Sequence, residues 1–358
     1  MAQALYPVVG VDIGKDTMHV VALDQSGAIA HKQRCTRATV LTRLLQLDAG
    51  LIAMEACPGA HHLGRCLSEQ GRAVHLLVAA DVRAFVRGHK NDYNDAQAIA
   101  EAAVRPTVRT VCIKSIEQQD VQMLHRLRAR LVRQRTALIN QARALLLEAG
   151  IPIAQGRKTI ARKLPELLAR DDVALSSCRR EMLTQCLNGW RQAQAEAEQI
   201  EAQLSQVARS DERCQRLLAV PGVGPLTATA LVAAVGNASE FRSGRDLAAW
   251  LGLVPRQHST GGVPRLLGIS KRGNTYVRWL LCHGGRSVRE HLKRDQHPWG
   301  PWITALEARM HPNKATVAVA AKLARVCWTI LRKGQTYKPR AGQANNSTNN
   351  RFCGAHAG

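Results

Sequence analysis

Four acidic residues, Asp12, Glu55, Asp92 and Asp95, are spaced so that they could bind divalent cations. Asp12 and Glu55 each close an apolar run, so each stands at the end of a predicted strand. Asp92 and Asp95 lie three apart at the start of a predicted helix, with both carboxylates on one face. Carboxylates gathered at one sheet edge repel unless cations neutralise them. Mg²⁺, or Mn²⁺ in its place, suits such ligands, and a pair of ions about 3.5–4 Å apart supports phosphodiester chemistry.

Each acid taken singly has a simpler explanation. Asp12 or Glu55 can end a strand in solvent. Asp is favoured at helix N-termini as a cap and dipole partner, which would account for Asp92 or Asp95. The string GVDIG (10–14) also resembles the phosphate-binding hairpin of sugar kinases and actin-like ATPases. The four acids together, in this order along the chain, favour the metal site.

The elements predicted around these acids form an α/β domain. Turn residues at 14–16 and 25–27 divide residues 6–34 into three antiparallel strands. A helix at 38–47, a strand at 51–57, a helix at 60–70, a strand at 73–79 and a helix from residue 92 follow. This order is typical of a ribonuclease H-like core, which would bring the acids together.

The chain then becomes helical and basic. Residues 116–150 and 179–209 keep helical apolar spacing and predict an antiparallel helical pair or an oligomerising coiled coil. Arginines, among them Arg126, Arg130 and Arg133, lie almost all round the first helix. A core helix would keep one face free of them, so this helix is predicted to contact nucleic acid.

Residues 217–236, LLAVPGVGPLTATALVAAVG, match a helix-hairpin-helix. In that motif the turn, here with Gly222 and Gly224, and the following helix N-terminus offer N–H groups to a DNA phosphate. The alternative is an ordinary helical hairpin packed in a core. The predicted fold class is therefore α/β followed by α, with a mainly helical C-terminal domain.

Positive charge is concentrated beyond the first domain. Residues 1–100 carry 10 Lys and Arg against 9 Asp and Glu, whereas residues 101–358 carry 40 against 18. The formal net charge of the whole chain is +23. An excess of this size predicts a polyanionic partner, with nucleic acid first, over a merely solvated basic surface.

The composition also argues against a membrane protein, a secreted disulfide-bonded protein and a zinc protein. The longest apolar runs are far shorter than the ~20 residues that span a bilayer, and no signal peptide opens the chain, so a cytoplasmic protein with no membrane partner is expected. Ten scattered cysteines without a CxxC pair predict reduced thiols and no zinc site. The segment 335–358 is poor in large apolar residues and predicts a disordered tail.

The acidic set, with KNDYNDA (90–96) as its most specific string, resembles the DEDD-type transposases of bacterial insertion sequences, whose N-terminal domain is similar to the RuvC Holliday-junction resolvase. The resemblance continues through 217–231, FRSGRDLAAWLGLVPRQHSTGG (241–262) and LLGISKRGNTYVRWLL (266–281). It covers nearly the whole chain apart from the extreme tail. Related site-specific DNA invertases share this layout, so the resemblance implies recombination more securely than mobility.

The resemblance implies a recombinase in which the acidic site of one subunit of a homodimer or homotetramer cooperates with a C-terminal serine of another. That serine links covalently to DNA, and an RNA encoded by the element guides the choice of donor and target DNA. The candidate here is Ser259, in PRQHSTGG, where a Ser/Thr-Gly turn is the alternative explanation. Ser270 and Thr260 remain open as the nucleophile. Lys271 and Arg272, after Ser270, are predicted to hold a phosphate at a helix start.

Four segments follow from this interpretation: a RuvC-like catalytic domain at 1–113, a basic helical region at 114–210, a C-terminal domain at 211–334, and the tail. The function expected is that of a magnesium-dependent transposase or site-specific recombinase. A structure-specific nuclease of the resolvase type would use the acids alone and would have no use for the PRQHSTGG segment. An ATPase would leave the positive charge unexplained.

Overall fold

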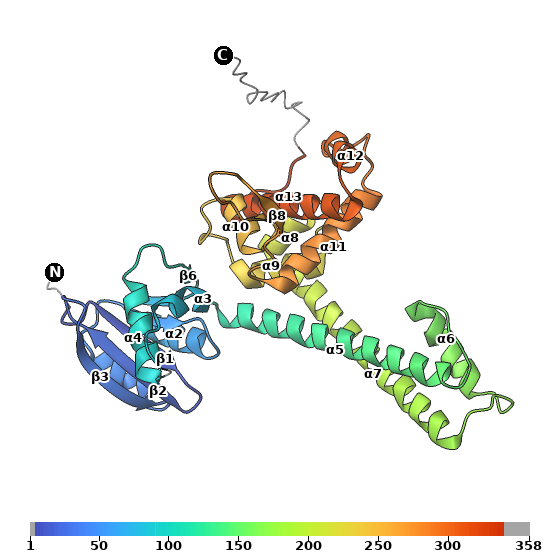
Figure 1. Ribbon diagram of the computed structural model, residues 1–358, viewed down its shortest axis with the longest axis horizontal. Helices are drawn as coiled ribbons and strands as arrows, with labels where there is room; N and C mark the ends of the chain where they lie inside the picture. The colour runs from blue at the N-terminus through green and yellow to red at the C-terminus, as the bar shows by residue number, and fades with distance from the viewer. Residues whose placement is uncertain (1–3, 90, 340–358) are drawn as a thin grey trace, which may run out of the picture. The chain divides into compact units, whose positions relative to one another are not determined.

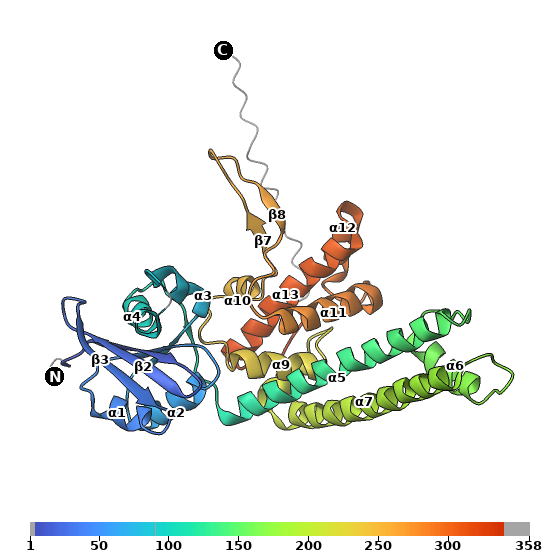
Figure 2. The same ribbon diagram turned by 60° about the horizontal axis from the view of Figure 1, so that its bottom comes forward.

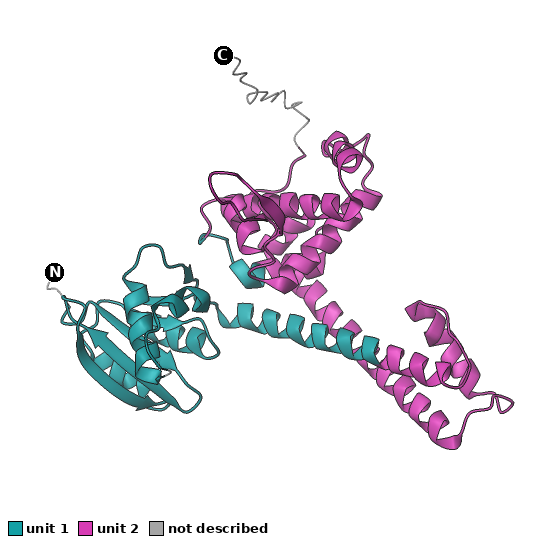
Figure 3. Cartoon of the chain, in the orientation of Figure 1, with its two compact units in different colours: residues 1–137, 232–240 teal, residues 138–231, 241–358 magenta. Residues whose placement is uncertain are grey.

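The computed structural model describes residues 4–89 and 91–339. The chain forms two compact units, one of residues 1–137 with 232–240 and one of residues 138–231 with 241–358 (Figure 3). These units do not follow the segment ends at 113 and 210. One continuous helix, which begins at Ile116 and ends at Leu147, crosses the boundary between the units at residue 137, and a short distant segment joins the first unit.

A mixed sheet is the centre of the first unit. In the described residues its order is β3-β2-β1-β4-β5-β6. The first three strands pair antiparallel, as predicted, whereas β1, β4 and β5 are parallel neighbours. The strands are β1 (Val8–Ile13), β2 (Thr17–Leu23), β3 (Ile29–Thr36), β4 (Ile52–Glu55), β5 (Val74–Leu77) and β6 (Thr110–Val111).

Helices cover both faces of this sheet (Figure 1). On one face, α1 (Val40–Gln46) and α2 (Ala60–Glu69) pack against the apolar side chains of β1, β2 and β4. On the other face lies α4 (Asp92–Ala103), preceded by α3 (Ala79–Val82) and the 3-10 turn η1 (Arg83–Phe85). The α/β/α layering agrees with the predicted ribonuclease H-like core.

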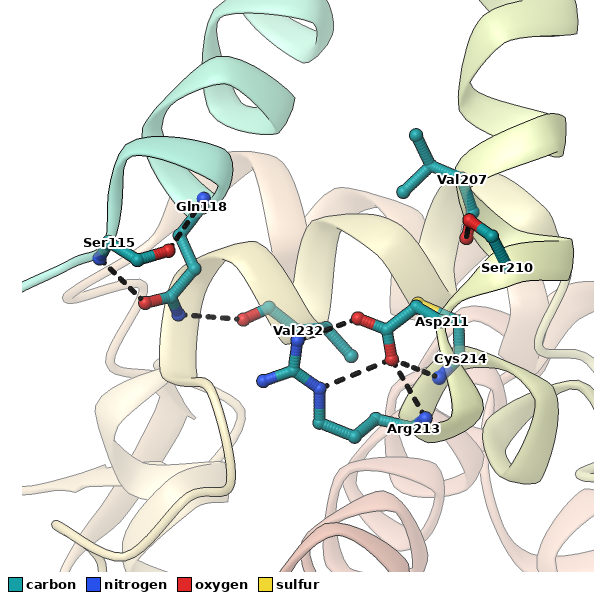
Figure 4. Close-up of polar contacts among 8 residues, drawn as sticks. All are labelled: Ser115, Gln118, Val207, Ser210, Asp211, Arg213, Cys214 and Val232. Carbon is teal, nitrogen blue, oxygen red and sulfur yellow. Dashed lines mark hydrogen bonds and ion pairs between the residues drawn. The ribbon is translucent and has the colours of Figure 1, made fainter.

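The helix α5 (Ile116–Leu147) begins in the first unit. Its start contacts residues 232–240, because Gln118 Nε2 donates to the Val232 carbonyl at 3.2 Å (Figure 4). In the next turn of the helix, Gln122 Nε2 donates to the Ala233 carbonyl at 2.9 Å. The Cys112 N–H donates to a Glu240 carboxylate oxygen. These contacts explain why a segment more than 100 residues away joins the first unit.

The second unit begins with three helices around one apolar cluster. The end of α5 packs against α6 (Arg157–Leu168) and the start of α7 (Ser177–Ser210), so α5 and α7 run antiparallel here (Figure 2). Gly189 of α7 brings the helices close, since a Cβ there would lie 3.2 Å from Leu138 Cδ1. Sequence reasoning foresaw both long helices but not α6.

The rest of the second unit is mainly helical, as predicted. Asp211 caps α8 by accepting from the Arg213 and Cys214 N–H groups, and the Arg213 guanidinium pairs with the same carboxylate (Figure 4). The elements are α8 (Glu212–Leu218), α9 (Pro225–Val235), α10 (Gly244–Trp250), the hairpin β7 (Pro255–Gln257) and β8 (Leu266–Ile269), α11 (Thr275–His291), α12 (Gly300–Arg309) and α13 (Pro312–Lys333).

The predicted tail begins as an ordered segment. The Tyr337 hydroxyl lies 3.2 Å from His297 Nε2, and its ring packs beside Trp299. The remainder of the predicted disordered tail, 340–358, lies outside the described residues. Within the described part of the chain, no helix is both long and apolar enough to cross a membrane.

Candidate functional site

The topology of the sheet brings Asp12 and Glu55 to one edge. Asp12 lies near the end of β1 and Glu55 ends β4, and these strands are parallel neighbours. Parallel strands present their carboxyl ends at the same edge, where α/β proteins commonly bind ligands.

Gly10 brings α4 and its two acids to that edge. A Cβ at Gly10 would lie 2.1 Å from the Ala96 carbonyl oxygen, so only glycine allows α4 to pack this closely on β1. The first turn of α4, with Asp92 and Asp95, therefore stands beside the end of β1.

The four predicted acids do gather at this place. Asp12, Glu55 and Asp95 line one open pocket of about 390 Å³, whose walls include Ala79 and Val82. Ligand atoms of Asp12, His19 and Asp92 all lie within 4.8 Å of one another. Arg83 also lines the pocket, and sequence reasoning did not single it out.

The surroundings of Asp12 raise the pKa of its carboxyl. Burial raises its pKa first, and the negative charges of Asp95 and Asp92 raise it further. Glu55 adds to this rise, while His19 opposes it. A carboxyl that its neighbours push toward the protonated form is relieved by a cation. The oxygen-rich donor set therefore fits a divalent ion.

The helix-capping explanation does not account for Asp92 or Asp95. Asn91 is the N-cap of α4, because its side-chain oxygen accepts from the Tyr93 N–H at 2.9 Å. Asp92 instead lies 3.5 Å from His19 Nδ1. The two carboxylates thus gain from the helix dipole without serving as its cap.

His19 is the residue of this site that sequence reasoning missed. It lies directly opposite Asp12 in the β1–β2 register, only 9% exposed, and its ring packs edge-on against Tyr93. A signal was present, because Gly14 pairs with Thr17 across a tight turn. Counting back from that turn places residue 19 opposite residue 12.

Ser259 lies in the exposed β7–β8 hairpin of the second unit. Its hydroxyl oxygen accepts from Gln257 Nε2 at 2.9 Å and from the Arg265 N–H at 3.2 Å. Ser259 and Thr260 are both exposed. The Ser270 hydroxyl, half-buried, accepts from the Arg272 N–H at 3.5 Å and so braces the turn before α11.

The residues predicted to contact nucleic acid lie mostly on the surface of the protein. Arg126, Arg130 and Arg133 are exposed and follow helical spacing on α5, so they form one stripe. Lys271 and Arg272 are exposed at the start of α11, where Lys271 adopts φ 55°. This turn is held by buried Arg278, whose guanidinium donates to the carbonyls of Leu251 and Arg272.

The two glycines of the PGVG turn differ. A Cβ at Gly222 would lie 2.6 Å from the Gly284 carbonyl oxygen of α11, and Gly222 has φ 79°. Gly224 is exposed, with nothing within 4 Å of such a Cβ. The close approach at Gly222 is therefore to protein, and only Gly224 presents open backbone.

Comparison with known proteins decides the family. Residues 9–151 match a family of transposases named DEDD_Tnp_IS110, and residues 214–298 match the transposase IS116/IS110/IS902 family. The chain belongs to this family of insertion-sequence transposases. It is 42% identical over 332 residues to the transposase for insertion sequence element IS1111A of Coxiella burnetii, covering 92% of this chain and 91% of that protein.

Other relatives agree. A probable family 20 transposase of Pseudomonas aeruginosa is 42% identical over 332 residues, covering 92% of this chain and 98% of that protein. The pilin gene-inverting protein of Moraxella bovis is 39% identical over 133 residues, covering 36% of this chain and 40% of that protein. The family makes this transposase an enzyme of DNA transesterification.

Proposed function

We propose that this transposase breaks and rejoins the DNA of an insertion sequence through a serine-linked intermediate, with divalent cations at its acidic site. The observation that carries the proposal is the gathering of Asp12, Glu55 and Asp95 around one pocket, with Asp92 beside Asp12 and the pKa of Asp12 raised. The substrate DNA would comprise the element ends and the target.

The proposed ligands are Asp12, Glu55, Asp92 and Asp95, with His19 orienting Asp92. Two Mg²⁺ ions, or Mn²⁺, would supply a Lewis acid at the phosphate. Because a nitrogen lies among the oxygens, His19 as a direct ligand would favour Mn²⁺. Arg83, on the wall of the same pocket, is placed to pair with a DNA phosphate.

Ser259 is the proposed nucleophile. Its oxygen attacks a DNA phosphorus and loses its proton, and one strand leaves as a free hydroxyl. A DNA hydroxyl then attacks the serine-linked phosphate, which restores the serine and joins the new strand. Two such exchanges conserve the phosphodiester bond, so rejoining needs no further energy source. The two hydrogen bonds to the Ser259 oxygen hold it on the hairpin without using its own proton.

The partners proposed beyond DNA are a guide RNA from the same element and further copies of the chain, as a dimer or tetramer. The basic stripe of α5, the Lys271-Arg272 turn and the Gly224 backbone would hold nucleic-acid phosphates. A nuclease of the resolvase type is less well supported, because the family match extends over residues 214–298, beyond the acidic domain.

The test follows DNA on denaturing gels after the chain is supplied with its intact element, including the flanking non-coding DNA. Asp12→Asn should abolish strand cleavage, because it removes an anionic ligand at constant size, whereas Asp16→Asn at the exposed β1–β2 turn should act like the wild type. Cleavage by Asp12→Asn at the wild-type rate would refute the acidic site.

Ser259→Ala should remove the covalent protein–DNA adduct while DNA binding persists. If the adduct survives in Ser259→Ala but is lost in Ser270→Ala or Thr260→Val, the nucleophile is misassigned and the mechanism stands. Active protein that never forms an adduct would favour the nuclease.

A further inference from the structure

The exposed face of α11 carries an aromatic stripe. Of the six tryptophans, all within the described residues, Trp279 alone is exposed, at 46%. Its ring stacks beside Tyr276, with centroids 6.2 Å apart and planes at 24°, and meets His283 edge-on at 4.3 Å. In a chain with only 4% Phe, Trp and Tyr, a group of three adjoining rings on one helix, with Trp279 and His283 exposed and Tyr276 half-buried, indicates a binding surface.

The opposite face of α11 makes this stripe rigid. Gly284 packs against Gly222 and Gly285 against the α13 backbone, where a Cβ would lie 2.7 Å from the Thr316 carbonyl oxygen. Val277, Leu281 and Val288 are also buried there. The aromatic rings therefore stand on a helix that is fixed from behind.

Cations continue the stripe at both ends. Tyr276, Trp279, His283 and Arg286 follow helical spacings of three, four and three, which places them on one side of α11, and Arg272 is exposed in the turn that precedes the helix. From Tyr276 to Arg286 the rise is about 15 Å. The one acid within α11, Glu290, is engaged by Arg289. An apolar protein partner would not need cations at both ends, whereas a nucleic-acid strand has bases to stack and phosphates to pair.

We propose that this stripe binds an unpaired segment of nucleic acid, with a base stacked on Trp279 and phosphates held by Arg272 and Arg286. The inference rests on the proposed function, since it names a further nucleic-acid contact of the same enzyme. Every base has a π-face, so the site is expected to tolerate sequence. An RNA loop and a displaced DNA strand share this chemistry.

The test measures binding of 12-mer oligo(dT), 12-mer oligo(U) and an abasic 12-mer with the same phosphates, in the absence of divalent ions. Trp279→Ala should weaken binding of the base-containing strands about 5- to 150-fold, leave the abasic strand unchanged, and lose the quenching of tryptophan fluorescence. Trp279→Phe should retain most of the affinity. Met182→Ala, which truncates a side chain 41% exposed on α7, is the matched control.

Arg272→Gln should weaken all three strands and lower the salt slope by about 0.7. Tighter binding of oligo(U) than of oligo(dT) would identify RNA as the occupant, and the reverse would identify DNA. Equal loss on the abasic strand, or no loss in Trp279→Ala, overturns the proposal. So does a change from oligomer to monomer in Trp279→Ala with unchanged oligonucleotide binding, which would assign the stripe to a second copy. These assays measure binding without cleavage. A negative result would therefore refute the stripe as a binding site and leave the outcome of the Asp12→Asn cleavage test unaffected.

Discussion

Replacing Gly222 by alanine separates the two interpretations of the PGVG turn. The new Cβ would lie 2.5 Å from Val288 Cγ2 and 2.6 Å from the Gly284 carbonyl oxygen, at φ 79°. A left-handed backbone costs an L-residue about 1–2 kcal/mol. Overpacking against a fixed backbone adds about 1–3 kcal/mol. Gly222→Ala should therefore destabilise the second unit by about 2–5 kcal/mol.

That loss is large enough to see in a thermal melt. For a unit of this size, 1 kcal/mol shifts the melting temperature by about 2–4 °C, so Gly222→Ala should melt about 4–20 °C lower when followed by circular dichroism. Gly224 has open space around it, so Gly224→Ala should change the free energy of unfolding by no more than about 0.5 kcal/mol.

DNA binding completes the comparison. If the Gly224 backbone holds a phosphate, Gly224→Ala should weaken DNA binding without a change in stability. A wild-type melting temperature for Gly222→Ala would refute the packing of this turn against α11. Gly284→Ala provides a reciprocal check, since its Cβ would lie 2.1 Å from the Gly222 carbonyl oxygen.

Three further outcomes are expected. Changing Arg126, Arg130 and Arg133 together to Gln should weaken duplex binding across sequences and lower the salt slope by about 0.9 per lost phosphate contact, and an unchanged slope would assign the stripe to solvent or to a protein interface. Mg²⁺ at 100 times its dissociation constant should stabilise the wild type and Asp16→Asn by about 2.7 kcal/mol in thermal melts, but not Asp12→Asn. Burial, and then Arg128, lower the pKa of His125 to about 4, so the folded state binds fewer protons than the unfolded state between pH 6.5 and 4. The free energy of unfolding should fall by about 3 kcal/mol as the pH falls through that window. His125→Leu should abolish this pH-dependent loss, whereas His62→Leu, at an exposed position, should not.

The sequence by itself determined the local elements and the identity of the acids. Strand alternation, turn glycines and helical spacing depend on near neighbours in the chain, so the three-stranded meander, α4 and the two long helices were predictable. The carboxylates at the predicted strand ends can be identified directly in the sequence. The same is true of the positive charge beyond residue 100.

Only the tertiary structure decided which groups meet. The tertiary packing of β2, η1 and α4 around β1 determines the pairing of His19 with Asp92, the capping of α4 by Asn91 and the place of Arg83 in the pocket wall. The composition of the first unit was equally hidden, because residues 232–240 join it through hydrogen bonds from side chains of α5 to distant backbone carbonyls. Such contacts leave no periodic pattern, since they join residues whose separation in the chain is set by the fold and not by the repeat of a helix or strand.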